Sequence, residues 1–525
     1  MIEWILGAAL LAIVIYHFTI KPMTYWTERG VKQGKSKWLV GDNWGSVTRT
    51  QSFADMILKV YNAVPDVRYS GIYQFTLPTL LVKDLELINQ LGVKDFDHFM
   101  DHKAFIPEKA DPLWGKNLFA LTGQRWREMR PILSPSFTSS KMKAMFVLMS
   151  ECAKNFSEYF IRKDKDSIEV EMKDLFTRFT NDVIATTAFG IEINSLETQD
   201  NEFYIMGRDI TNFKGFWKSM KFFGYLIIPK ILSFLKIRFF EKSVANFFTK
   251  IIDETIKVRK EKGIVRPDMI HLLLEARKGG SHKKEKVEDV GFAVVEKTDL
   301  GKAFIKEITN LDIAAQAMIF FFAGFDTASS LMSFMAYELA LHPEIQKRLR
   351  EEIEKTLEEC NGNVTYSAIL KMKYMDMVVS ESLRKWPIAI AIDRVCTKPY
   401  TIQPTKPGEK PLHIEKGTII WFPIFGIHHD PAYYPDPDRF DPERFGEDNT
   451  ENIVPYSFLP FGVGPRNCIG SRFALLETKV VFFYILCNFE IVPNAKTDIP
   501  IQISKSSFNL LAENGFWFDL KRLRK

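Results

Sequence analysis

A short glycine-rich loop near the C-terminus, Phe461-Gly-Val-Gly-Pro-Arg-Asn-Cys-Ile-Gly470, is the feature of this sequence that most narrows its fold. Its three glycines allow the backbone to turn tightly and bring amide N–H groups close to the sulfur of Cys468. Such a cradle suits an unpaired thiolate ligand that is shielded from water and oxidants. Taken alone, the loop also fits a surface turn with a buried free cysteine, which is the commonest fate of an intracellular cysteine.

The order Phe-x-x-Gly-x-Arg-x-Cys-x-Gly resembles the haem-binding signature of the cytochrome P-450 family, and every fixed position is filled. The resemblance implies a mainly α-helical cytochrome P-450 fold with a small β-region, which binds haem b through the thiolate of Cys468. Thiolate ligation pushes electron density onto haem iron and favours O–O bond cleavage. Phe461 can cover the sulfur, and Arg466 can reach a haem carboxylate with its planar guanidinium.

The composition fits a large globular protein that also contacts an apolar environment. Of the 525 residues, 46% are hydrophobic and 44 are phenylalanine. Length alone suggests about three or four domains, whereas the resemblance implies one large haem domain. The net charge of +5 is too small and too scattered to indicate a nucleic-acid partner. The five cysteines form no C-x-x-C pair and no disulfide-like spacing, which indicates a reducing compartment.

The chain is almost wholly apolar from Trp4 to Ile20, at the short end of the roughly 17–25 residues that a membrane-spanning helix needs. Glu3 precedes this run and basic residues follow it, so the positive-inside rule places the bulk of the chain in the cytoplasm. A cleaved secretory peptide would need a basic start and a small-residue cleavage site, and neither is present. We expect a transmembrane anchor over residues 1–20, a linker over 21–45 and the haem-thiolate monooxygenase domain over 46–525.

Two segments in the N-terminal half are expected to surround the pocket. The pattern from Gly71 to Val82 predicts two short strands around a turn. Between Phe99 and Gln124 no helix or strand period persists, and a plain surface loop of this length would be unusual. By resemblance, this segment lies over the haem and shapes the substrate pocket, with Phe105 and Phe119 as its candidate residues.

Trp126 and Arg130 are four residues apart and therefore share one face of a predicted helix. Alone, such a pair is more often surface packing. In the family that the chain resembles, a Trp-x-x-x-Arg pair lies beside the haem and holds a propionate. The resemblance therefore assigns Trp126 and Arg130 to cofactor binding.

The region from 213 to 240 interleaves aromatic residues with lysines. This mixture could form a platform for single-stranded nucleic acid. A membrane-surface segment fits better, because apolar side chains can enter the lipid while lysines meet the headgroups. By resemblance, the region is the roof of the substrate channel. An ordinary amphipathic core helix remains an alternative for about half of it.

One long helix is predicted after the capping box Thr309–Asp312, and it continues until Pro343 stops it. Its length would permit a second membrane span, but its polar residues make this expensive, so we expect it to cross the core. Gly324 costs roughly 1 kcal/mol relative to alanine inside a helix. The hydroxyl of Thr327 can bond to a carbonyl one turn earlier. Together these residues could open a groove for O2.

Asp326 and Thr327 place an acid beside an alcohol at this groove, which is suited to a proton relay from solvent. Asp326 would bring protons in, and Thr327 would hold the oxygen and its water. The alternative is structural: the small residues let another helix cross closely here, and the aspartate is hydrogen-bonded within the protein. Resemblance to the family's oxygen-binding motif favours the catalytic interpretation, with Phe322 and Ala323 as neighbouring pocket residues.

Glu381 and Arg384 lie three residues apart on a predicted helix, where an exposed pair contributes only about 0.2–0.5 kcal/mol. By resemblance to the family's Glu-x-x-Arg motif, they form a buried lock with Arg444 from the segment Pro442-Glu-Arg-Phe445. The lock serves the fold and the haem pocket rather than the chemistry.

An extended apolar segment follows Pro387 and is expected to run past the active site. Ile388, Ala389 and Ile390 are its candidate pocket residues, and Arg394 is a second candidate for the propionates. After the cysteine loop, residues 471–486 predict an apolar helix that packs beneath the haem.

Five motifs occur in family order, so the chain is identified as a member of the cytochrome P-450 family, most similar to insect microsomal enzymes related to vertebrate drug oxidisers. The resemblance implies a monooxygenase of the endoplasmic reticulum membrane, with its catalytic domain on the cytoplasmic side and with lipophilic xenobiotics as substrates. NADPH–cytochrome P-450 reductase would supply the electrons, and the resemblance also allows cytochrome b5 as a partner.

Three alternatives remain open at this level. The chain could hydroxylate an endogenous hormone or lipid. It could be a thiolate-haem isomerase that needs no reductase, although the intact Asp326–Thr327 pair argues against this. It could also be a haem-binding protein without turnover.

Overall fold

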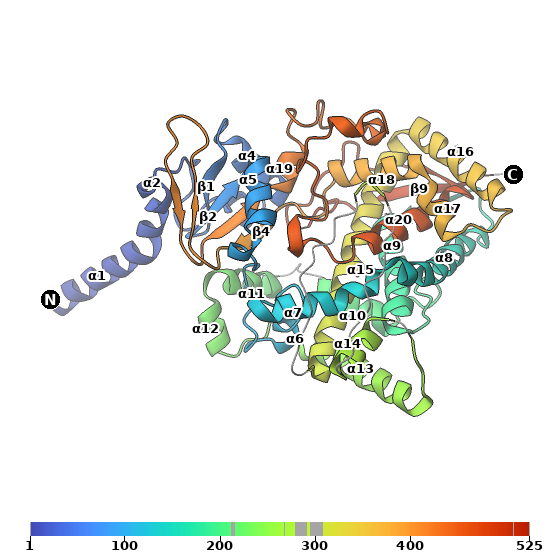
Figure 1. The fold of residues 1–525 in the computed structure, drawn as a ribbon, viewed down its shortest axis with the longest axis horizontal. Coiled ribbons are helices and arrows are strands. Elements are labelled where there is room, and N and C mark those ends of the chain that lie inside the picture. Colours follow the sequence, from blue (N-terminus) through green and yellow to red (C-terminus); the bar gives the residue numbers. More distant parts are fainter. Residues whose placement is uncertain are drawn as a thin grey trace.

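The computed structural model describes residues 2–104, 106–211, 216–266, 268–278, 291–293, 308–507 and 509–523. Helices dominate this part of the chain (Figure 1), so the predicted fold class, mainly α with a small β-region, is confirmed. The longer helices are α1 (Ile2–Ile15), α4 (Phe53–Asn62), α7 (Gly123–Leu133), α8 (Ser139–Ile161), α9 (Met172–Ile184), α10 (Glu202–Thr211), α11 (Phe216–Ile227), α12 (Pro229–Phe234), α13 (Lys242–Lys262), α14 (Met269–Arg277), α15 (Asn310–Leu341), α16 (Pro343–Glu359), α18 (Lys373–Lys385) and α20 (Ser471–Leu486). Short helices are α2 (Tyr25–Glu28), α3 (Trp44–Val47), α5 (Leu85–Asn89), α6 (Pro112–Gly115), α17 (Tyr366–Lys371) and α19 (Ile424–His428).

Strands in the described residues form three small sheets. The first has the order β1-β2-β7-β4, with β1 (Tyr69–Gln74), β2 (Leu77–Val82), β7 (Ile419–Phe422) and β4 (Ile392–Val395). The others pair β3 (Ser167–Glu171), β9 (Trp517–Arg522) and β8 (Phe489–Pro493), and β5 (Tyr400–Ile402) with β6 (Leu412–Ile414). The predicted hairpin within residues 71–82 is therefore confirmed, with its first strand beginning two residues earlier.

The long helix α15 crosses the middle of the molecule (Figure 1) and packs against α9, α13 and α18. Its N-terminus carries the predicted capping box: the Thr309 side chain accepts from the Asp312 backbone, and the Asp312 side chain accepts from the Thr309 backbone. The helix ends before Pro343, as the sequence indicates. Because most of its side chains are buried on all sides, α15 is the core helix of the fold.

At the N-terminus, α1 projects away from the body of the molecule on the side of the β1–β2 hairpin (Figure 1). In the part of the chain that the structure describes, two helical stretches are long and apolar enough to cross a membrane. In the most apolar 18-residue window of the first stretch, Glu3–Glu28, no residue is buried, whereas 67% of the corresponding window of the second, α15, is buried.

Residues that follow α1 pack onto the first sheet. Trp26 is fully buried, and its indole N–H donates to the carbonyl of Ile72 at 3.2 Å. A Cβ on Gly71 would lie 2.3 Å from the Trp26 ring, so only glycine allows the ring to lie this close to β1. The base of α1 is therefore joined firmly to the sheet.

Candidate functional site

A cavity of about 460 Å³ lies beside the centre of α15. Its wall combines residues of α15, the segment 99–124, the strand segment after Pro387 and the loop 460–470. Four regions that are far apart in the sequence thus meet at one space. Most of the wall is apolar, and its few polar groups are concentrated near the loop and its neighbours.

The loop before α20 holds Cys468 at the cavity wall. The backbone N–H of Cys468 donates to the carbonyl of Phe461 at 2.8 Å, which closes the turn, and Phe461 also lines the cavity. Gly464 has a φ of +68°, and a Cβ there would lie 1.9 Å from the carbonyl oxygen of Gly92, so this turn requires glycine. The cradle expected from the sequence is therefore present.

Cys468 presents its exposed surface to the cavity, while protein surrounds the residue. Burial raises the pKa of its thiol, although the backbone N–H of Gly470 and the charge of Arg130 both lower it. None of the five cysteines forms a disulfide. The sulfur is thus a free thiol with cationic and N–H stabilisation nearby, which is what a metal-binding thiolate needs.

Three arginines line the cavity: Arg394 and Arg466 are buried, and Arg130 is half-buried. Burial lowers the pKa of Arg130 to about 10 and of Arg394 to about 10. Burial and the neighbouring charge of Arg394 lower the pKa of Arg466 to about 9. All three remain cationic at neutral pH, so an anion in the cavity would relieve their mutual repulsion.

The three arginines differ in how many of their N–H groups have a hydrogen-bond acceptor within the protein. Arg130 donates to the Asn467 side chain at 2.8 Å, and Arg394 donates to the carbonyl of Val463 at 3.0 Å. Within the described residues, the buried Nε of Arg394 has no acceptor. A buried N–H group without an acceptor costs free energy. The carboxylate of a bound cofactor would supply the missing acceptor.

Arg466, which is expected to reach a haem carboxylate, also makes contacts within the protein. Its guanidinium donates to backbone carbonyls of the segment 99–124, at 2.8 Å to Met100 and 3.2 Å to Leu118, and it lies 4.3 Å from the ring centre of Trp126. Arg466 therefore also ties the segment over the cavity to the cysteine loop. Trp126 is buried against it, on the same helix face as Arg130.

His102 is a cavity residue that sequence reasoning missed. Its Nδ1 lies 2.9 Å from Oδ1 of Asp393, and its ring stacks on Phe119 with a centroid distance of 4.7 Å. Burial lowers the pKa of His102. Burial also acts to raise the pKa of Asp393, but His102, the backbone N–H of Lys103 and the charge of Arg394 together lower it to about 2. No motif surrounds this histidine, so only its position in the fold reveals it.

Two side chains of the largely buried helix α15, Ala323 and Thr327, are exposed to the cavity. They are four residues apart and so lie on one helix face. The hydroxyl of Thr327 donates to the carbonyl of Ala323, the backbone contact that the sequence indicates. Gly324 packs close to the end of α9, since a Cβ would lie 2.7 Å from Ile184. Asp326 does not line the cavity.

Most of the other residues predicted to line the pocket do so, and one does not. Phe119, Phe322, Ile388 and Ala389 line the cavity. Ile390 does not: it is 4% exposed in the apolar core, where its carbonyl accepts from Phe425. Phe105 lies outside the described residues. Further lining residues, which the sequence did not single out, are Trp114, Leu118, Phe137, Ile319, Ile392 and Ile469.

The Glu-x-x-Arg pair is fully buried. Arg384 Nε and Nη2 donate to the two Glu381 oxygens at 2.9 and 2.7 Å, a two-pronged ion pair. Arg384 also donates to the carbonyls of His428 and Pro437, and Arg444 Nε lies 3.6 Å from Glu381. The three residues therefore join α18 to the segment 428–444 beside the cysteine loop.

Comparisons with known proteins agree with this geometry. The sequence model of the family described as cytochrome P450 matches residues 68–517. The chain is 45% identical to cytochrome P450 9e2 of Blattella germanica, over 99% of this chain and 97% of that protein. It is 40% identical to probable cytochrome P450 9f2 of Drosophila melanogaster, over 98% of each chain, and 37% identical to cytochrome P450 6k1 of Blattella germanica, over 97% of this chain and 94% of that protein.

Proposed function

Because the chain belongs to the cytochrome P450 family, and is therefore a monooxygenase that uses haem b, we propose that it oxidises lipophilic foreign compounds at the cytoplasmic face of the endoplasmic reticulum membrane. The observation that carries this proposal is the cavity. It brings a cysteine, three arginines and a helix-borne threonine to one largely apolar space. The similarity to insect proteins named cytochromes P450 9 and 6 supports a detoxifying role.

In this proposal Cys468 binds the haem iron, and Arg130, Arg394 and His102 hold the propionates, with Trp126 packed beside them. Arg466 also reaches a haem carboxylate, and it fixes the segment 99–124 above the cavity. Haem b supplies the iron at which dioxygen is reduced, and thiolate ligation favours cleavage of the O–O bond. Electrons come from NADPH through a reductase, as is general in the family. We propose that NADPH–cytochrome P450 reductase is that donor and that cytochrome b5 can assist it.

The chain's own side chains supply substrate placement and proton handling. Aromatic and aliphatic residues of the cavity, among them Phe119, Phe322 and Ile388, hold an apolar substrate and exclude water. Thr327 Oγ1 stands at the cavity wall and holds a proton or a water molecule there. Asp326, its neighbour in the chain, connects this site to solvent. An apolar wall of this kind favours lipophilic substrates over charged ones.

Reconstitution with the reductase tests the proposal and separates it from the alternatives. We expect NADPH to be consumed only when reductase and a lipophilic substrate are both present, with hydroxylated or epoxidised product released. An isomerase would instead transform a peroxide without NADPH, and a simple haem-binding protein would do neither. Formation of product from a hormone or endogenous lipid, but from none of a panel of foreign compounds, would favour the endogenous role.

We propose that residues 1–20 form a single-pass anchor, 21–45 a linker that packs on the first sheet, and 46–525 the haem domain. The helices α11 and α12 provide a second membrane contact. These helices and the two residues after α12 expose large apolar side chains, Trp217, Ile227, Ile231, Phe234 and Leu235, among the basic residues Lys230 and Lys236. The ring centroids of Phe223 in α11 and Phe75 at the tip of the β1–β2 hairpin are 5.6 Å apart. The helix α1 projects on the same side as this hairpin (Figure 1). This arrangement suits a bilayer surface.

A protein lacking residues 1–20 is expected still to bind phospholipid vesicles. Replacing Trp217, Ile231 and Phe234 by serine in that truncated chain should reduce vesicle binding about tenfold or more, because each buried large side chain contributes roughly 1.5–3 kcal/mol. Sedimentation with vesicles measures the bound fraction. A matched triple replacement of the exposed apolar residues Val147, Val265 and Ile499 should have little effect. Equal losses for both triples would contradict the assignment of this surface.

A further inference from the structure

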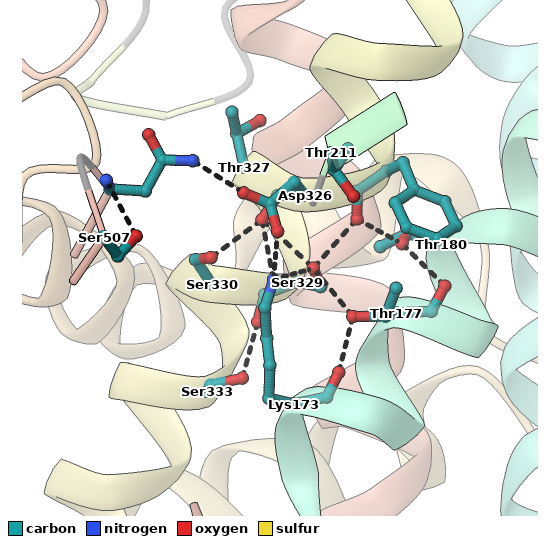
Figure 2. Close-up of polar contacts among 12 residues, drawn as sticks. Lys173, Thr177, Thr180, Thr211, Asp326, Thr327, Ser329, Ser330, Ser333 and Ser507 are labelled. Carbon is teal, nitrogen blue, oxygen red and sulfur yellow. Dashed lines mark hydrogen bonds and ion pairs between the residues drawn. The ribbon is translucent and has the colours of Figure 1, made fainter. Parts of the chain in front are cut away.

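The carboxylate of Asp326 is not part of the cavity wall and lies in a cluster of polar side chains between α15 and α9 (Figure 2). Its Oδ1 accepts a hydrogen bond from Nζ of Lys173 at 2.8 Å, and its Oδ2 accepts one from Nδ2 of Asn509 at 2.9 Å. Lys173 comes from α9, and Asn509 comes from the segment between β8 and β9. Two elements that are distant in sequence thus fix both oxygens of one acid.

Lys173 is built into this site rather than paired loosely at the surface. Its ammonium group also donates to the backbone carbonyl of Asp326 at 3.0 Å and to Oγ of Ser329 at 2.6 Å, so three acceptors meet its three protons. Thr177 of α9 in turn donates to Ser329 (Figure 2). The side chains of Lys173 and Asp326 remain 18% and 15% exposed, so water can still reach the acid.

The adjacent residue faces the other way. Thr327 exposes its hydroxyl-bearing side chain to the cavity, whereas the Asp326 side chain is absent from the wall. Consecutive side chains on a helix differ by about 100° around its axis. The acid and the alcohol therefore stand on neighbouring faces of α15, the acid toward Lys173 and Asn509 and the alcohol toward the cavity.

We infer that Lys173 and Asn509 are positioning residues for the reaction: they hold Asp326 where it exchanges protons with solvent and hands them to Thr327 without opening the cavity to bulk water. A proton taken from water at Asp326 leaves on the cavity side, and the carboxylate is restored for the next one. This inference rests on the proposed function, and it adds two residues that belong to none of the motifs found in the sequence.

The test uses the full-length haem protein with reductase and one lipophilic substrate. Lys173→Met should lower the product formed per NADPH by roughly tenfold, less than the roughly 10²–10⁴-fold typical of a general acid itself. Hydrogen peroxide should account for the lost electrons, and the solvent isotope effect on turnover in D2O should increase. Asn509→Leu should act in the same direction, and Lys173→Arg should restore part of the coupling.

Three comparisons separate positioning from a merely structural role. The double variant Lys173→Met/Asp326→Asn should be no worse than Asp326→Asn alone, because Lys173 acts through that carboxylate. Lys116→Met is the matched control. It breaks the ion pair between Lys116 Nζ and Oδ1 of Asp312 in α15, which are 3.1 Å apart and similarly buried. This variant should keep wild-type coupling. Substrate binding and reduction by the first electron should stay unchanged in Lys173→Met.

Wild-type coupling and isotope effect in both Lys173→Met and Asn509→Leu, beside an impaired Asp326→Asn, would overturn the inference and leave the proposed function standing. Additive losses in the double variant would overturn it as well, since they would show that Lys173 acts independently of Asp326. Wild-type coupling and isotope effect in Asp326→Asn would instead contradict the relay that the proposed function assigns to this acid.

Discussion

Serine in place of Cys468 is expected to reduce monooxygenase turnover to background while the protein remains folded. The side chain lies at the cavity wall in a turn closed by backbone hydrogen bonds, so the change of one atom should disturb packing little. A serine hydroxyl, however, does not supply the thiolate that favours O–O cleavage. Product formation with reductase and NADPH measures the loss.

Cys396 provides the matched control for this substitution. It is buried away from the cavity, and its sulfur donates to the carbonyl of Lys398 at 2.9 Å, a bond that a serine hydroxyl can replace. Cys396→Ser should therefore keep most of the turnover. Substantial turnover in Cys468→Ser, at wild-type haem content, would contradict the assignment of the iron ligand.

Replacing Arg384 by alanine is expected to lower the free energy of unfolding by about 3–5 kcal/mol, because it leaves the buried Glu381 without its partner. Both side chains are fully buried, and burial already raises the pKa of Glu381 despite the opposing effect of Arg384. The loss of hydrogen bonds to the carbonyls of His428 and Pro437 should also loosen the segment that leads to the cysteine loop. Urea unfolding followed by circular dichroism measures the change.

An exposed arginine gives the comparison for this variant. Arg348 pairs with Glu443, and both side chains are at least half exposed. Arg348→Ala should therefore cost no more than about 1 kcal/mol. Similar losses in the two variants would show that the Glu381–Arg384 pair is not a structural lock.

Local patterns in the sequence were sufficient to predict several elements of the fold. The capping box at Thr309 and the proline at 343 mark the two ends of α15, because both act through neighbouring backbone groups. The hairpin within residues 71–82 and the helix over 471–486 are likewise local patterns. The cysteine loop was recognised because its glycines meet a steric need that is visible in the spacing.

Contacts between distant segments were beyond the reach of these patterns. Lys173 and Asn509 meet Asp326 across 153 and 183 residues, so only the packing of α9 and the C-terminal segment on α15 brings them together. His102 reaches Asp393 across 291 residues for the same reason. The placement of Ile390 depends on how the segment before β4 twists, which side-chain type does not determine.

The measurement that tests the central claim most directly is the absorption spectrum of the purified wild-type protein, reduced and bound to carbon monoxide. A Soret band at the long wavelength typical of thiolate–haem–CO is the result we predict, because Cys468 is a free thiol at the wall of the cavity. A band at the shorter wavelength of haem with a neutral ligand, or the absence of haem from well-folded protein, would contradict the account.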